Sequence, residues 1–200
     1  MQHFNRAVRF AVGILVLATG AAWIQGSAAE DRAQGLASWF PRLREGMWIK
    51  VEGERTADGM LRATEIKVLY GELDEWEVES HIDSVDVVHL KLMTTLGLEV
   101  AANSKTRLDG PAGQKRITFA FFEPGDQVEI EGQWQNDGTF LAEDIDVEKS
   151  KKLHPDMRVN NRHEIRGRID AIDAQLHRVV LVGITVLFDE DTKNKTPKVD

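Results

Sequence analysis

Side chains that could take part in acid–base or metal chemistry are present, but their spacing matches no known catalytic or metal motif. The histidines beyond the first residues are His81, His89, His154, His163 and His177. They form neither the i, i+4 pair of a zinc helix nor a short chelating hairpin. His81 also aligns with Arg168 in an internal sequence correspondence, which predicts an exposed strand position. We therefore expect solvated histidines, no metal site and no cofactor.

Carboxylates are abundant around Trp76, at Glu72, Asp74, Glu75, Glu77 and Glu79. Calcium sites of the EF-hand type need an Asp-x-Asp-x-Asp-Gly loop, which is absent. The two acids of a glycosidase have to converge across a cleft, and no pattern here predicts convergence. A Gly-x-Ser-x-Gly nucleophile motif is absent too. We expect a charged edge strand or a solubilising face, no catalytic residues and a non-enzymatic protein; a metal-dependent hydrolase is the least favoured alternative.

Three tryptophans are the best candidates for a ligand or partner surface: Trp48, Trp76 and Trp134. Trp48 has the strand parity opposite to Ile49 and Val51, which places it outside the predicted core. An exposed indole can stack on a sugar ring or contact a partner protein. The alternative role for these side chains is to cover barrel ends or to pack between two barrels.

The elements that position these residues are predicted by a correspondence between two segments. Residues 46–53 align with residues 125–132, and each segment begins and ends with glycine around an alternating strand pattern. In each copy an Asp-Gly pair follows, Asp58-Gly59 or Asp137-Gly138, and predicts a hairpin with a type I′ turn. We call each of these stretches a glycine-hairpin block.

The returning strand of each hairpin changes parity. Leu61 and Ala63 share one parity, whereas Ile66 and Val68 have the other, and the second copy repeats this change. The pattern predicts β-bulges near residues 64–65 and 143–144. Bulges bend strands, and small barrels need bent strands to close.

A second correspondence joins residues 77–106 to residues 164–192, with β-branched alternation typical of three short strands. The chain therefore alternates between glycine-hairpin blocks and these strand-rich blocks. One interpretation is two tandem units. The other takes residues 76–148 as a complete central unit flanked by two half-units.

This order of residues resembles an uncharacterised family of small exported bacterial domains, known only as a domain of unknown function. The closest matches are Gly125-Asp126, Gly132, Asp137-Gly138, Ala142 and Ile145. The resemblance implies an OB-like β-barrel in which the strand-rich block precedes the hairpin block. It implies no catalytic residues.

The resulting prediction is an all-β protein with two small OB-like barrels. Residues 76–148 would form the central barrel, and the half-unit of residues 45–70 would pair with residues 163–195 to close a second one. An open half-barrel would expose strand edges, which soluble proteins avoid. Residues 30–44 are expected to be a tether or short helix and residues 149–162 a linker; locally folded tandem units are the alternative.

The N-terminus has the pattern of a cleaved export signal. Arg6 and Arg9 precede an apolar stretch over residues 10–22, and Ser27-Ala28-Ala29 supplies small residues for cleavage after residue 29. The apolar stretch is shorter than the roughly 20 residues that span a bilayer. We therefore expect a periplasmic or secreted protein with no stable membrane anchor after cleavage.

The net charge restricts the partners. The formal charge of the chain is −8, and removal of Arg6 and Arg9 makes it more negative. Nucleic acids and anionic lipid headgroups require cationic surfaces, so neither is expected as a partner. Cysteine is absent, so the fold must depend on an apolar core. We expect a binding or adaptor module for an envelope protein or a glycan; the alternative is a structural accessory of envelope secretion or assembly.

Overall fold

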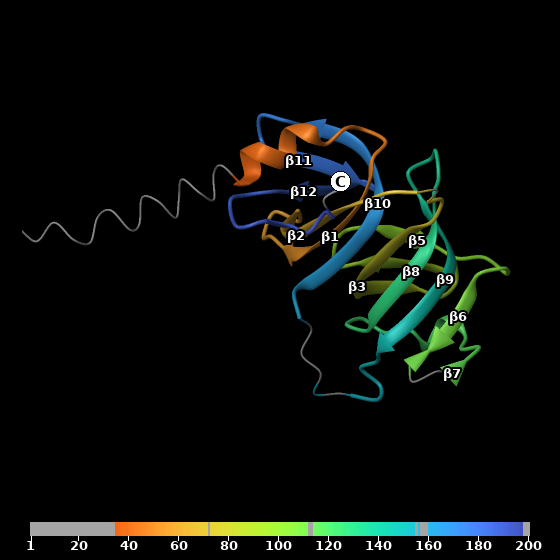
Figure 1. Cartoon of the computed structure of the whole chain (residues 1–200). Helices are drawn as coiled ribbons and strands as arrows, with labels where there is room; N and C mark the ends of the chain where they lie inside the picture. Colours follow the sequence, from red (N-terminus) through yellow and green to blue (C-terminus); the bar gives the residue numbers. More distant parts are fainter. Residues whose placement is uncertain (1–34, 72, 112–113, 155, 157–159, 198–200) are drawn as a thin grey trace, which may run out of the picture.

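The computed structural model describes residues 35–71, 73–111, 114–154, 156 and 160–197. The predicted leader and the first residues of the predicted tether lie outside this part of the chain. The described part is mostly β-sheet with a closed five-stranded barrel, which confirms the predicted fold class. Residues 35–39 are helical and lead into the first 3₁₀ turn (Figure 1). The elements that follow are η1 (Phe40–Arg42), β1 (Trp48–Arg55), β2 (Leu61–Leu69), β3 (Trp76–Asp86), β4 (Lys91–Thr94), β5 (Glu99–Ala101), β6 (Arg107–Gly110), β7 (Gln114–Lys115), η3 (Phe119–Phe121), β8 (Gln127–Trp134), β9 (Phe140–Lys149), β10 (Arg162–Asp173), β11 (Arg178–Leu181), β12 (Ile184–Leu187) and β13 (Lys193–Asn194).

One ring of strands is formed by β3, β4, β5, β9 and β8. Each strand pairs with the next, and β8 pairs with β3 to close the ring. All of these pairings are antiparallel except that of β5 with β9, which is parallel. The strands β6 and β7 lie outside the ring, where β6 pairs with β9. We call this ring barrel 1.

A second ring draws its strands from both ends of the described chain. The strands β10, β11 and β12 pair in succession, β12 pairs in parallel with β2, and β2 and β1 return to β10. In the sequence, β1 and β2 precede the strands of barrel 1, and β10, β11 and β12 follow them. The segment that forms barrel 1 is therefore inserted between the two segments that form this second ring. We call this ring barrel 2. The short strand β13 adds to β2.

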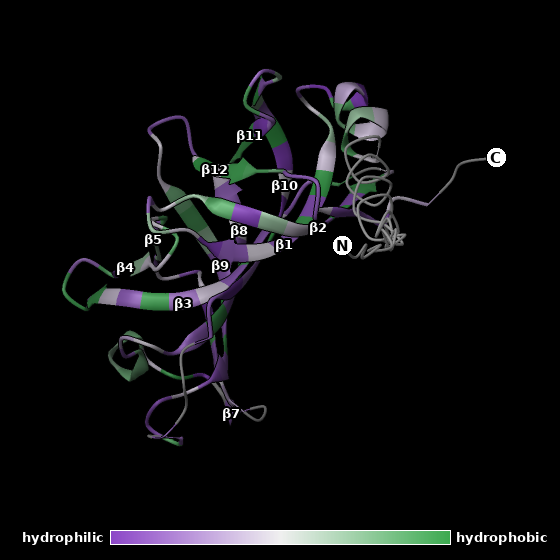
Figure 2. Cartoon of the chain, turned by 90° about the vertical axis from the view of Figure 1, so that its left-hand side faces the viewer, coloured by the Kyte–Doolittle hydropathy of each residue, from purple (hydrophilic) through white to green (hydrophobic). Residues whose placement is uncertain are grey.

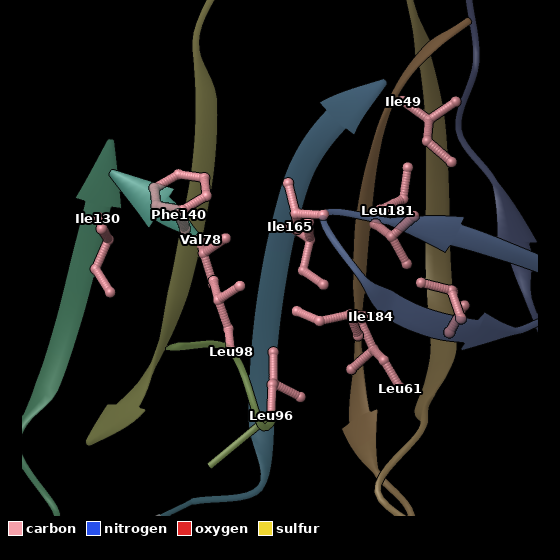
Figure 3. Packing of buried hydrophobic residues seen from close by; sticks show 14 of the residues in the cluster. Ile49, Leu61, Val78, Leu96, Leu98, Ile130, Phe140, Ile165, Leu181 and Ile184 are labelled. Atoms are coloured by element: carbon pink, nitrogen blue, oxygen red, sulfur yellow. The ribbon is translucent and has the colours of Figure 1, made fainter. Parts of the chain in front are cut away.

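The two barrels are joined by antiparallel pairing of β3 with β10. Val78 lies directly opposite Ile165, and these two residues also correspond to each other in the sequence alignment of the strand-rich blocks. Corresponding strands of the two barrels therefore pair with each other, and a pseudo-two-fold axis relates them. Figure 3 shows Val78 and Ile165 at the centre of the apolar residues, between Phe140 of barrel 1 and Leu181 of barrel 2.

Alternation along the strands fills both barrels with apolar side chains. Hydropathy changes residue by residue along the strands (Figure 2). Ile49 and Val51 are fully buried in barrel 2, and Val128 and Ile130 are fully buried in barrel 1. Burial of such a side chain contributes roughly 1.5–3 kcal/mol to folding, and without a disulfide these contacts hold the barrels together.

A short 3₁₀ turn covers the core beside each hairpin block. Phe40 and Leu43 are buried next to η1, and Phe119 and Phe122 are buried next to η3. The two turns are separated in the sequence by the same number of residues as the two glycine-hairpin blocks. Residues 35–42 are helical, in agreement with the short-helix alternative for residues 30–44, and matching apolar positions precede the glycine of each hairpin block.

The predicted bulges are confirmed at both sites. In the first hairpin, Glu52 pairs with Glu65 and the next residue pairs with Ala63, so one residue of β2 has no partner. The second hairpin has the same register shift after Glu131. The backbones approach closely there, and a Cβ on Gly53 or Gly132 would meet a carbonyl oxygen of the facing strand. Glycine is required for this approach.

The predicted type I′ turns are wrong. Gly59 and Gly138 have φ values of 83° and 84°, but the preceding aspartates do not have positive φ. Thr56 and Met60 close the first loop by a backbone hydrogen bond, which leaves three residues, 57–59, between this bonded pair. In a three-residue loop a single glycine in the left-handed region follows an ordinary turn.

We predict that Gly132→Ala lowers the free energy of unfolding by about 3 kcal/mol, because the methyl group would overlap the carbonyl of Leu141. Gly35→Ala is the control, since its Cβ would meet no atom within 4 Å. Chemical denaturation of both variants measures the difference. Equal stability of the two variants would contradict the close approach.

Candidate functional site

The outward face of six neighbouring strands forms one continuous surface across both barrels. The strands lie in the order β2, β1, β10, β3, β8 and β9, and their registers place outward residues in two rows. The first row is Lys67, Lys50, Arg166, Glu77, Glu131 and Asp144. The second row is Glu65, Glu52, Glu164, Glu79, Glu129 and Asp146. We call these two rows the junction face.

The two halves of the junction face differ in charge. On the barrel 2 half, Lys50 Nζ lies 2.5 Å from Glu164 Oε1. Arg166 reaches across the junction, with a distance of 3.0 Å between its terminal nitrogen and Glu77 Oε2. On the barrel 1 half, all six members of the two rows are acidic.

Three carboxylates of the barrel 1 half converge. Glu77, Glu129 and Glu131 each place an oxygen within 4.8 Å of the other two. These are the side chains that could hold a cation, because carboxylate oxygens are the ligands that calcium prefers. Sequence spacing did not show this convergence, since Glu77 lies on β3 and its neighbours lie on β8. The predicted edge-strand role for Glu77 is wrong, because β3 pairs with β4, β8 and β10.

Burial and like charges act on Glu129. Desolvation raises the pKa of this carboxyl from 4.5 to about 6, and repulsion from Glu77, Glu148 and Glu131 adds to the effect. Asp144 is also buried; its Oδ2 pairs with Arg107 of β6, and its Oδ1 has no hydrogen-bond partner among the described residues. The barrel 1 half therefore carries more negative charge than its neighbours neutralise.

The three predicted tryptophans lie near the junction of the barrels. Trp48 lies on the outward side of β1, with its ring centroid 5.2 Å from that of Trp76. Trp76 covers Gly167 of β10, and Trp134 covers Gly183 in the turn between β11 and β12. All three are half-buried. Trp76 and Trp134 pack against the apolar core, whereas Trp48 is not part of that packing.

Two histidines, His81 and His163, are buried and contradict the predicted solvated positions. His81 was expected at an exposed position by alignment with Arg168, but only 1 % of its surface is exposed. His81 pairs with Gln127 of β8 and its ring is covered by contact with His163 of β10, whereas Arg168 is exposed. The ring of His81 packs edge-on against His163, with 5.8 Å between centroids.

This histidine pair is buried where the barrels meet. His163 Nδ1 lies 3.0 Å from Ser80 Oγ, and His81 Nδ1 has no hydrogen-bond partner among the described residues. Burial, together with the neighbouring His81, lowers the pKa of His163 from 6.5 to about 4. Burial also lowers the pKa of His81. Both rings are therefore neutral at pH 7 and pack as part of the junction.

Two stretches of the chain, residues 13–67 and residues 78–146, match the model of DUF5666, a domain of unknown function. The chain belongs to this family. Both DUF5666 matches end at corresponding positions of their hairpins, residues 67 and 146. Residues 13–34 of the first match lie outside the described part of the chain.

No curated protein and no solved structure matches the chain. Among the described residues, no helix has the length and apolarity needed to cross a membrane.

We predict that acid destabilises the protein partly through His163. The pKa of this ring is lower in the folded state, so its contribution to stability is present above pH 6.5 and is lost as the pH falls towards 4. The free energy of unfolding of the wild type should fall between pH 6.5 and pH 4. In His163→Gln this fall should be smaller by about 2 kcal/mol. Denaturant titrations at several pH values measure this. His154→Gln, at an exposed position, is the control and should keep the wild-type slope.

Glu129 has the opposite linkage. Its folded pKa is raised to about 6, so protonation favours the folded state, and this stabilisation is lost as the pH rises from 4.5 through 6. Glu129→Gln should therefore stabilise the protein at pH 7 by about 1 kcal/mol, a value reduced for the partial solvation of the carboxyl. Glu65→Gln on the mixed half of the junction face is the control. A Glu129→Gln variant no more stable than the wild type at pH 7 would contradict the effect of burial and like charges on this carboxyl.

Proposed function

We propose that this chain is a non-enzymatic protein of the bacterial cell envelope, exported to the periplasm or secreted, whose outer β surface binds a protein or glycan partner. The observation that carries the proposal is the position of Trp48. Its indole lies half-buried on the outward side of β1, next to the junction face, with its ring tilted by 45° against that of Trp76, and it is not part of the core packing. A supported indole of this kind offers a large contact area at low cost in side-chain entropy.

The packing of the barrels supports an external binding surface. Phe140 and Ile145 are fully buried inside barrel 1, and Leu61 and Leu181 are fully buried inside barrel 2. Small barrels with interiors filled by side chains bind their ligands on the outer strands and loops. A ligand of this protein would accordingly contact outward residues such as those of the junction face.

The three tryptophans would have different roles at this surface. Trp76 and Trp134 cover Gly167 and Gly183 and so contact the opposite barrel. Trp48 shares the outward side of β1 with Lys50 and Glu52. We expect Trp48 to contact the partner, while Trp76 and Trp134 hold the junction in the geometry that presents it.

The export part of the proposal rests on the N-terminal sequence and on charge. Arg6, Arg9 and the apolar stretch over residues 10–22 have the pattern of a leader. The net charge of −8 favours a protein or glycan over nucleic acid, because phosphate backbones require a cationic surface.

The experiment is affinity capture from an envelope extract, together with a glycan array, using the protein without residues 1–29. Trp48→Ala should weaken binding of the captured partner about tenfold or more, because loss of a central aromatic contact costs roughly 2 kcal/mol. Trp39→Ala is the matched control, since it removes a half-buried indole that packs on Phe188 of barrel 2, with 5.5 Å between ring centroids. Thermal unfolding of both variants checks that the fold is retained.

Two results would contradict the proposal. Capture that is unchanged by Trp48→Ala, with an outer-membrane component as the captured protein, would favour a structural accessory of envelope assembly. Turnover of a captured substrate would make the protein an enzyme.

A further inference from the structure

A cavity of about 380 Å³ lies on the barrel 2 half of the junction face. Its volume is in the range of small-molecule sites, about 300–1,000 Å³. The charged side chains around it are all basic: Lys50, Lys67 and Arg166. The remaining lining residues are mainly apolar, namely Val68, Leu69, Tyr70, Leu73 and Pro197.

The strand registers place these three cations side by side. Lys50 of β1 lies opposite Lys67 of β2 on one side and opposite Arg166 of β10 on the other. They are therefore successive members of one row of the junction face. Three positive charges at this spacing occur in a protein whose net charge is −8.

The three cations keep unused hydrogen-bond donors. The ammonium of Lys50 makes one ion pair, with Glu164, and has two further N–H groups. Arg166 uses a terminal nitrogen for Glu77, and its buried Nε has no hydrogen-bond acceptor among the described residues. Lys67 is exposed and makes no ion pair with a described residue. A buried donor without an acceptor is costly, and an anion in the cavity would remove that cost.

The fold itself does not require these cations. In the corresponding hairpin of barrel 1, Glu129 stands in place of Lys50 and Asp146 in place of Lys67. Both hairpins nevertheless have the same pairing and the same bulge. The basic row is therefore a property of one copy only, which indicates a role other than folding.

We propose that this cavity binds a small organic anion with a single carboxylate on an apolar body. The carboxylate would accept hydrogen bonds from Arg166 and the two lysines, since a guanidinium and a carboxylate match in geometry. The apolar body would lie against Val68, Leu69 and Leu73. Glu77 and Glu164 are paired with the same cations, and their negative charge disfavours a ligand with two or more charges.

This inference goes beyond the proposed function and does not depend on it. The cavity does not include Trp48, Trp76 or Trp134 among its lining residues. Capture of an envelope partner and binding of a carboxylate can therefore succeed or fail separately.

Calorimetric titration with octanoate tests the proposal, with octanamide and octylammonium as neutral and cationic ligands of the same chain length. The protein without residues 1–29 should bind octanoate saturably and at least tenfold more tightly than octanamide, because a charged carboxylate accepts stronger hydrogen bonds from these cations than a neutral amide does. Octylammonium should not bind.

Lys67→Met should weaken octanoate binding about fivefold or more and leave thermal stability unchanged, because Lys67 makes no ion pair with the rest of the described chain. Arg166→Met should weaken it further. Lys105→Met, an exposed lysine of barrel 1, is the matched control and should bind like the wild type. The proposal is overturned if octanoate does not bind, if octanamide binds equally well, or if Lys67→Met has the affinity of the Lys105→Met control.

Discussion

The pairing of β3 with β10 is the contact on which the rest of the structure depends. It places Val78 opposite Ile165 and joins two rings that would otherwise share no strand pairing. It also brings β1 and β8 to either side of one continuous sheet. Each barrel closes through one parallel contact, β5 with β9 or β12 with β2, which leaves β3 and β10 free to pair with each other. The junction face exists because of this contact.

The junction also explains why similar strands carry different surfaces. Outward residues of β1 and β2 include Lys50 and Lys67, whereas their counterparts on β8 and β9 are acidic. The inward residues keep the same apolar character in both barrels, because a closed small barrel has room only for packed side chains. The outward positions are not restricted in this way. One half of the face could therefore become acidic, with a raised pKa at Glu129, while the other half lines a basic cavity.

Buried polar groups at the junction also limit how the two barrels can be placed relative to each other. His81 and His163 pack as neutral rings, and their lowered pKa values link the junction to pH. Tryptophans cover glycines across the same boundary, with Trp76 on Gly167 and Trp134 on Gly183. Contacts of this kind hold two barrels at a fixed relative position, which a surface that spans both of them requires.

The amino-acid sequence alone determined the local features. Alternation predicted the strands, glycine spacing predicted the hairpins, and a change of parity predicted the bulges, because each depends on neighbours in the chain. The tertiary structure decided which strands meet, and so it decided the burial of His81, the convergence of Glu77 with Glu129 and Glu131, and the row of Lys67, Lys50 and Arg166. These features join residues far apart in the chain, and alternation within one strand carries no information about the strand that will lie beside it.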